Sequence, residues 1–298
     1  MLELKNIHKR FANKVALNDL SLVVNDGEIL SLIGQNGAGK STTFRIILYF
    51  IQADKGNVLW DGKVMGKKER SQIGFMPEER GLYQKETIIN QMIYFADLHG
   101  MEHIELRTKL KDWMKRLNVV GKSTDRVESL SKGNAQKVQL IATMLFEPKL
   151  LILDEPFSGL DPVNATLLVN EILKAKENGA MIILSSHNMD NVERLSDKVV
   201  MLKHGNTVLE GTPLEIIHRF ERTKLRVDGL VDLEILKKFN GVSNIKCDSR
   251  GVYHAELQNE GIGKSMFKRI CQNQGYIPVF DQSYPSLDEI FKIKVDES

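Results

Sequence analysis

The chain has 298 residues, of which 42% are hydrophobic and 27% charged, and its net charge is +2. This length is long for a single core, so we expect one large and one small domain. The near-balance of charge argues against the clustered basic face that nucleic-acid binding usually requires, and we expect no nucleic-acid partner.

Most of the chain alternates between strand-like and helical patterns. Apolar stretches predict strands at 2–11, 14–24, 27–34, 56–62, 71–77, 149–154, 181–186 and 198–203. A helix is expected to start near Lys40, and the stretch from about Lys85 to Val120 has the i, i+3, i+4 apolar spacing of helices. Such alternation predicts a parallel sheet covered on both faces, and hence an α/β fold.

Composition and rhythm change after about Glu221. The segments 224–227, 231–239, 242–247, 252–257, 261–274 and 277–284 predict the order β-α-β-β-α-β of ferredoxin-like folds. A last helix is expected to begin at the serine cap Ser286. We therefore expect a large domain over 1–221 and a small α+β domain over 222–298. The sequence leaves the role of the small domain open between regulation, dimerisation and bracing.

One glycine-rich segment fits the pattern G-x-x-x-x-G-K-[ST], directly after an apolar strand and directly before a helix. The segment comprises Gly34, Gln35, Asn36, Gly37, Ala38, Gly39, Lys40 and Ser41, and Thr42 follows it. Glycines let backbone N–H groups wrap phosphates, Lys40 supplies a charge at the terminal phosphates, and the Ser41 hydroxyl is a ligand for Mg²⁺. A plain Gly-rich turn is the alternative, but context and spacing together predict a site for ATP or a similar triphosphate.

The motif LLILDEPFSGLDP places two carboxylates at the end of a buried strand. Successive strand side chains point to opposite faces, so Asp154 and Glu155 are expected to have different tasks. We expect Asp154 to face the Mg²⁺ shell and Glu155 to act as general base towards an attacking water. The plainer alternative is a strand end followed by an acidic turn. Asp161 before Pro162 likewise has the pattern of a helix N-cap.

His187 follows the predicted strand at 181–186 and precedes a helix that opens near Asn188. Taken alone, this pattern is typical of a capping or solvated histidine. Ligands of parallel sheets bind beyond the carboxyl ends of the strands, and His187 shares that edge with Gly34 and Asp154. We therefore expect His187 in the catalytic site.

A second feature suited to anions is LSKGNAQKVQLIAT, which begins at Leu130. Ser131 is a natural N-cap, Gly133 removes side-chain bulk, and an apolar helical spacing follows. A bare helix N-terminus of this kind attracts an anion. The sequence thus places two anion sites in one chain.

Together these motifs resemble the nucleotide-binding subunit of ATP-binding cassette (ABC) transporters, from about Leu2 to Glu221. The resemblance implies a P-loop NTPase fold, with a mixed sheet and a helical subdomain at about 79–133, and an ATPase activity. The matching segments are Gly34–Thr42 (Walker A), Leu150–Glu155 (Walker B), Ser158–Asp161 (D-loop), His187 (switch histidine) and Phe11, which stands where an aromatic ring stacks on adenine.

Leu130–Gln136 resembles the family signature L-S-G-G-Q-Q, with Lys132, Asn134 and Ala135 in place of Gly, Gln and Gln. In the family this helix caps the ATP of the opposite subunit. The resemblance therefore implies a dimer of two copies, in which Ser131 and Gly133 reach the γ-phosphate in trans. Asp161, as part of the D-loop, is counted with the nucleotide-binding residues.

Glu78 stands where the family has the glutamine of the Q-loop. A glutamate still ligates Mg²⁺, but it lacks the N–H donor of an amide and adds a charge beside two other carboxylates. The strings PEERGLY and LSKGN and the appended small domain resemble the ATPases of ABC-2 type exporters, including bacterial sodium-extrusion ATPases.

The two cysteines, Cys247 and Cys271, form no C-x-x-C pair and indicate a reducing compartment. No stretch reaches the roughly 18 apolar residues of a membrane span. We expect an ATP-hydrolysing subunit at the cytoplasmic face of the membrane, powering an exporter whose permease is a separate polypeptide. That permease would dock on the residues after Glu78 and the helical stretch to Val120. The alternatives are a soluble ABC ATPase that acts on ribosomes or DNA, and a regulatory module that binds ATP without turnover.

Overall fold

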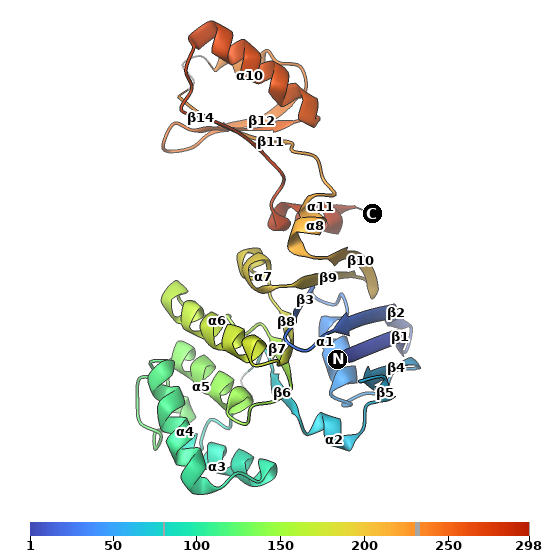
Figure 1. Ribbon diagram of the computed structural model, residues 1–298, viewed down its shortest axis with the longest axis vertical. Helices are drawn as coiled ribbons and strands as arrows, with labels where there is room; N and C mark the ends of the chain where they lie inside the picture. Colours follow the sequence, from blue (N-terminus) through green and yellow to red (C-terminus); the bar gives the residue numbers. More distant parts are fainter. Residues whose placement is uncertain (80, 230–232, 298) are drawn as a thin grey trace. The chain divides into compact units, whose positions relative to one another are not determined.

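A computed structural model describes residues 1–79, 81–229 and 233–297. The chain divides into two compact units, Met1–Thr212 and Pro213–Ser298 (Figure 1). This division falls at Thr212, ahead of the expected boundary at Glu221. Three parts of the predictions lie outside the described residues: Arg80 of PEERGLY, the first residues of the helix expected at 231–239, and the C-terminal Ser298.

The first unit is built on a six-stranded central sheet in the order β10-β9-β3-β8-β7-β6. Its strands are β3 (Ile29–Ile33), β6 (Ile73–Met76), β7 (Leu150–Asp154), β8 (Met181–Ser185), β9 (Lys198–Lys203) and β10 (Asn206–Gly211). All neighbours pair in parallel except β10, which runs antiparallel to β9. The predicted mixed sheet is confirmed, and the carboxyl ends of β3, β7 and β8 share one edge.

A second, antiparallel sheet in the order β2-β1-β4-β5 comes from the N-terminal part of the first unit. Its strands are β1 (Leu2–Phe11), β2 (Lys14–Val24), β4 (Lys55–Trp60) and β5 (Lys63–Val64). Helix α1 (Lys40–Ile47) shares one core with both sheets, in which Phe44 packs with Leu4 and Leu32. The short helix α2 (Lys67–Arg70) follows this sheet.

The remaining helices of the first unit form a core with the opposite face of the central sheet. They are α3 (Ile88–His99), α4 (His103–Arg116), α5 (Lys132–Met144), α6 (Pro162–Glu177) and α7 (Met189–Leu195), with a 3-10 turn at Val127–Ser129. Strand β7 shows the division, because Leu151 and Leu153 face this core while Leu150 and Ile152 face the other. A sheet covered on both faces is confirmed.

The second unit contains the predicted β-α-β-β-α-β order. Its elements are β11 (Lys224–Asp228), α9 (Glu234–Lys237), β12 (Val242–Cys247), β13 (Tyr253–Leu257), α10 (Glu260–Gln274) and β14 (Val279–Ser283). The strands form an antiparallel sheet in the order β12-β13-β11-β14, which is ferredoxin-like. Helices α8 (Pro213–Ile217) and α11 (Leu287–Asp296) complete the unit, and Ser286 caps α11 as predicted.

In the described parts of both units, no helix has the length and apolar character needed to cross a membrane.

Candidate functional site

The loop between β3 and α1 forms a backbone cradle that tolerates no side chain at two of its glycines. Gly34 has φ +150°, and a Cβ there would lie 2.4 Å from the carbonyl oxygen of Leu202. Gly39 has φ +121°, and its Cβ would lie 2.8 Å from the carbonyl oxygen of Ala16. The chain can follow this path only without these side chains. The loop then opens α1 at Lys40, as the motif predicts.

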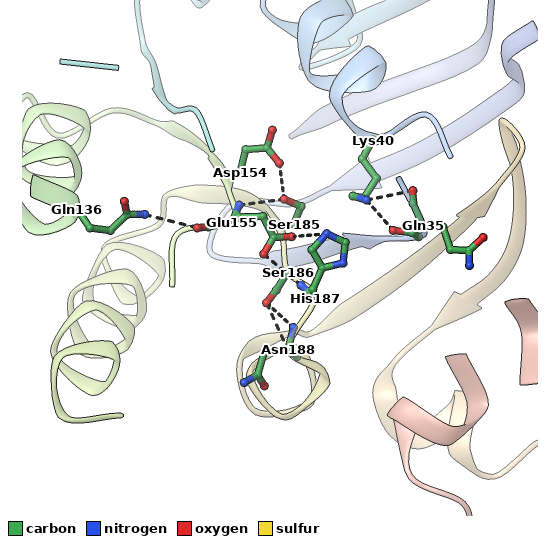
Figure 2. Close-up of polar contacts among 10 residues, drawn as sticks. Gln35, Lys40, Gln136, Asp154, Glu155, Ser185, Ser186, His187 and Asn188 are labelled. Carbon is green, nitrogen blue, oxygen red and sulfur yellow. Dashed lines mark hydrogen bonds and ion pairs between the residues drawn. The ribbon is translucent and has the colours of Figure 1, made fainter. Parts of the chain in front are cut away.

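Lys40 is buried, with 8% of its surface exposed. Its Nζ donates to the carbonyl oxygen of Gly34 at 2.6 Å and to that of Gln35 at 3.3 Å (Figure 2). Burial lowers the pKa of the Lys40 amine, against the opposing attraction of Glu155, Asp154 and Glu78. The amine therefore lies in the field of three carboxylates.

Asp154, the last residue of β7, is held by the neighbouring strand. The Ser185 hydroxyl donates to Oδ1 of Asp154 at 2.6 Å and accepts the backbone N–H of Glu155 at 3.1 Å. Ser185 stands opposite Asp154 in the parallel register of β7 and β8. One hydroxyl thus fixes both acidic positions. This role of Ser185 was not predicted, because a serine at a strand end carries no signal of such a contact.

Glu155 lies beyond the end of β7 and turns out of the strand, with φ +51°. The sequence suggested that strand alternation would separate Asp154 from Glu155. In the structure the two side chains face different partners because the backbone turns out of the strand at Glu155. A left-handed backbone at a non-glycine residue is uncommon and is held by the surrounding structure.

The Glu155 carboxylate is buried beside His187. Its Oε2 accepts the backbone N–H of His187 at 3.2 Å, and its Oε1 lies 3.6 Å from Nε2 of the same histidine (Figure 2). Within the described residues, Oε1 is a buried side-chain oxygen with no hydrogen-bond donor. Burial raises the pKa of Glu155, against the opposing influence of His187 and Lys40. This carboxylate is poised to accept a proton.

These groups line one hollow of about 210 Å³ at the carboxyl edge of the central sheet. The hollow brings together residues from five separate segments of the first unit: Phe11, Lys14, Ala16, Asn36, Gly37, Gly39, Lys40, Ser41, Thr42, Glu78, Asp154, Glu155 and His187. Lys14 and Ala16 were not predicted, although they directly follow Phe11 in the same hairpin.

Six predicted nucleotide-binding residues do not line this hollow: Gly34, Gln35 and Ala38 of the glycine-rich loop, and Ser131, Gly133 and Asp161 at the N-terminal ends of two helices. Ser131 caps α5, and its hydroxyl accepts the backbone N–H of Asn134 at 3.3 Å; Gly133 lies in the first turn of the same helix. Asp161 caps α6, and its Oδ1 accepts the backbone N–H of Asn164 at 2.9 Å. The cap that the sequence suggested for Asp161 is therefore present. Neither end reaches the hollow of its own chain.

Helix α5 carries two buried glutamines that the sequence analysis did not single out. Nε2 of Gln136 donates to the carbonyl oxygen of Pro156 at 3.0 Å and lies 3.5 Å from that of Glu155. Nε2 of Gln139 donates to the carbonyl oxygen of Pro77 at 2.7 Å. Helix α5 thus holds the backbone on two sides of the hollow.

The fold and this hollow define a P-loop nucleotide-binding protein. The model of the family "ABC transporter" matches residues 17–158, and the model "ATP-binding protein DrrA1-3-like, C-terminal domain" matches residues 211–295. The ABC transporter ATP-binding protein YhaQ of Bacillus subtilis is 39% identical over 295 residues, which are 99% of this chain and 98% of YhaQ.

Two further comparisons support the same assignment. The Nod factor export ATP-binding protein I of Rhizobium sp. (strain N33) is 32% identical over 219 residues, which are 72% of each chain. The solved dimer of a post-hydrolysis ATP-binding cassette bound to ADP and Pi has a TM-score of 0.64 over 71% of this chain and 98% of its own, at 22% identity, and shows the shared fold.

The chain belongs to the ATP-binding subunits of ABC transporters. This family hydrolyses ATP, its ATP-binding subunits dimerise and associate with membrane permeases, and it includes exporters.

Proposed function

We propose that the chain powers an exporter of sodium or another small solute, with a separately encoded permease, from the cytoplasmic face of the membrane. The proposal is carried by one observation: a hollow with a complete set of candidate catalytic side chains occurs in a chain whose second unit matches the DrrA-like domain. The relative named for Nod factor export supports the direction of transport. Retention of Glu155 speaks against a module that binds ATP without turnover.

The donors around the hollow fit an ATP molecule with Mg²⁺. The glycine-rich loop lines the hollow with Asn36, Gly37 and Gly39, and the backbone N–H groups of such a loop bind phosphates. Ser41, Asp154 and Glu78 offer the hard oxygen ligands that Mg²⁺ prefers, and the rest of its shell normally comes from phosphate and water. When bound, Mg²⁺ would neutralise charge on the transferred phosphate.

The chain's own residues divide the remaining work. Lys40 would leave the carbonyl oxygens of Gly34 and Gln35 for the terminal phosphates, and Phe11 at the rim of the hollow would stack on adenine. Glu155 would accept the proton of the attacking water, because its buried Oε1 has no competing donor. His187 would hold the other oxygen, Oε2, through its backbone N–H, while its ring lies 3.6 Å from Oε1.

Ser131, Gly133 and Asp161 would complete the site of a second copy, since they lie outside the hollow of their own chain. A charge-assisted hydrogen bond contributes roughly 1.5–3 kcal/mol. Two such bonds at each of two sites give about 6–12 kcal/mol before desolvation, whereas moving a two-state equilibrium from 1:99 to 99:1 takes about 5.5 kcal/mol. The γ-phosphate is therefore sufficient to close the dimer, and hydrolysis would release it.

The permease would dock on the residues after Glu78 and the helical stretch to Val120. A hollow lined by Phe75, Phe95, His99 and Phe146 lies beside this stretch, and His99 stacks on Phe146 with ring centroids 4.4 Å apart. Tyr83, Tyr94 and Leu98 are exposed in the same stretch. Exposed aromatic and apolar side chains near a groove are typical of protein interfaces.

The proposed transport role is tested by purification from membranes. A tagged chain should be recovered from detergent-solubilised membranes together with a polypeptide rich in apolar spans, and ATP hydrolysis of that complex should be lost in Glu155→Gln. Recovery of the chain solely from the soluble fraction, bound to ribosomes or DNA, would replace the transport assignment with a soluble ABC ATPase.

A further inference from the structure

The segment that carries Glu78 continues beyond the end of its sheet. Strand β6 pairs with β7 only as far as Met76, opposite Leu153. The next residue, Pro77, has no backbone N–H to offer. Glu78 therefore stands on a stretch of backbone that the sheet does not fix, although its side chain lines the hollow.

Helix α5 takes the place of a neighbouring strand along this segment. Gln139 is buried, with 4% exposed. Its Nε2 donates to the carbonyl oxygen of Pro77 at 2.7 Å and to that of Glu79 at 3.4 Å. One turn later, the Thr143 hydroxyl lies 3.4 Å from the carbonyl oxygen of Phe75. Alternate carbonyls of an extended chain point the same way, so one face of this helix receives all three.

The amide of Gln139 thus bonds the carbonyl oxygens on both sides of Glu78. The Glu78 side chain is itself exposed, and an exposed side chain takes its direction from the backbone that carries it. The bond to Pro77 fixes the peptide group that precedes Glu78, and the bond to Glu79 fixes the carbonyl of the following residue. Held on both sides in this way, the backbone at Glu78 has less freedom, and its dihedral angles decide where the carboxylate can reach.

We infer that Gln139 is a positioning residue that aims the Glu78 carboxylate into the nucleotide hollow. The inference rests on the proposed role of Glu78 as a Mg²⁺ ligand. It explains a polar side chain in an otherwise apolar part of α5, between Val138 and Leu140, both of which are fully buried. Buried polar side chains are retained where their hydrogen bonds are satisfied.

Helix α3 offers a matched control for Gln139, the glutamine Gln91. Gln91 of α3 is equally buried, with 3% exposed. Its amide also makes two backbone hydrogen bonds, accepting the N–H of Tyr83 at 2.9 Å and donating to the Tyr83 carbonyl oxygen at 3.1 Å. It holds the same connecting segment, but beyond Glu78. Replacement of Gln91 therefore measures the general effect of losing a buried amide, without a change in the backbone next to Glu78.

The experiment measures binding of the non-hydrolysable analogue AMP-PNP to the full chain by calorimetry, with Mg²⁺ and with EDTA. The ratio of the two dissociation constants gives the tightening due to Mg²⁺. Gln139→Met, which keeps the volume and lacks the donors, should reduce this ratio about fivefold, as expected for one backbone hydrogen bond. Gln91→Met should leave the ratio unchanged, although both variants lower the thermal midpoint. Should Gln139→Met fail to fold, Gln139→Leu tests the same loss of donors.

The background variant Glu78→Ala separates the inference from the function on which it rests. Glu78→Ala should reduce the ratio by itself, and adding Gln139→Met should reduce it no further. A ratio unchanged in Gln139→Met, or an equal further loss in the Glu78→Ala background, overturns the positioning role. A ratio unchanged in Glu78→Ala overturns the metal role of Glu78 itself.

Discussion

Replacing Glu155 by glutamine should have opposite effects on activity and on stability. The amide has nearly the shape of the carboxylate, but it cannot accept the proton of an attacking water. We expect Glu155→Gln to bind ATP, to accumulate as a dimer and to lose turnover. Because the substitution also removes a buried charge, the free energy of unfolding of the first unit should rise.

The size of the stability gain follows from the contacts of the two carboxylate oxygens. The bond from the His187 N–H to Oε2 is retained by the amide oxygen. Oε1 is buried without a donor, and leaving a buried group unsatisfied costs about 1–3 kcal/mol, and more when the group is charged. The amide nitrogen that takes this position is polar but neutral, so the gain is the part of that cost that comes from the charge. Against this stands the contact with the His187 ring at 3.6 Å, whose side chain is half-exposed, and such pairs contribute about 0–1 kcal/mol.

The net gain is therefore about 1 kcal/mol, or about 2–4 °C in Tm for a unit of this size. The gain depends on pH with a definite sign. Burial raises the pKa of Glu155 above its ordinary value of 4.5, so the native state holds this proton more tightly than the unfolded chain. Stability of the parent protein then falls as pH rises from 4.5 to the raised pKa, and it stays lower above that value.

Differential scanning calorimetry without nucleotide, between pH 4.5 and 8, checks this dependence. The Tm difference between Glu155→Gln and the parent should be positive at pH 8 and vanish towards pH 4.5, where both side chains are neutral. Glu193→Gln on the exposed face of α7 is the control and should change neither activity nor Tm. Undiminished turnover in Glu155→Gln would show that Glu155 is not the general base. A Tm below that of the parent at pH 8 would show that the buried charge of Glu155 does not destabilise the protein.

Three further substitutions test other parts of the structure. Ser131→Trp should prevent the ATP-dependent dimer in size-exclusion chromatography and abolish turnover; a monomer that hydrolyses ATP at full rate would contradict the two-copy site. Glu78→Gln should retain or improve steady-state turnover, and a complete loss would show an obligatory anion. Gly56→Ala, whose Cβ would lie 2.3 Å from the carbonyl oxygen of Asn6 at φ +87°, should lower Tm more than Gly62→Ala, which has φ +75° and open space; the backbone strain of about 1 kcal/mol is common to both.

The phosphate loop and the acidic strand end were predictable because each depends on local spacing. Gly34 and Lys40 are fixed by their distance along a loop that must turn from strand to helix. Asp154 and His187 follow apolar strands, and the carboxyl ends of parallel strands meet at one edge. The position of the hollow can therefore be predicted from the order of the strands and helices, once the strands are recognised as parallel.

The supporting contacts were not predictable in the same way. Ser185 bonds Asp154 across 31 positions of the chain, and Gln139 bonds Pro77 across 62. A hydroxyl or an amide has no characteristic spacing at such separations, and only the folded register places it. The left-handed turn at Glu155 was also missed, because a glutamate gives no hint of positive φ. Short elements such as β5 and α8 escaped for lack of periodicity.

The carboxylate of Glu78 adds a negative charge to the hollow. Asp154, Glu155 and Glu78 attract the amine of Lys40, whose pKa is lowered by burial, and Lys14 is a second lysine in the lining of the hollow. A family member with glutamine at the position of Glu78 has one negative charge fewer beside the triphosphate. If Glu78 binds Mg²⁺ as proposed, this chain should depend more on the cation to offset repulsion between protein and ATP. The added charge would then help only when the carboxylate is directed at the cation, which is the role proposed for the hydrogen bonds of Gln139 to the backbone around Glu78.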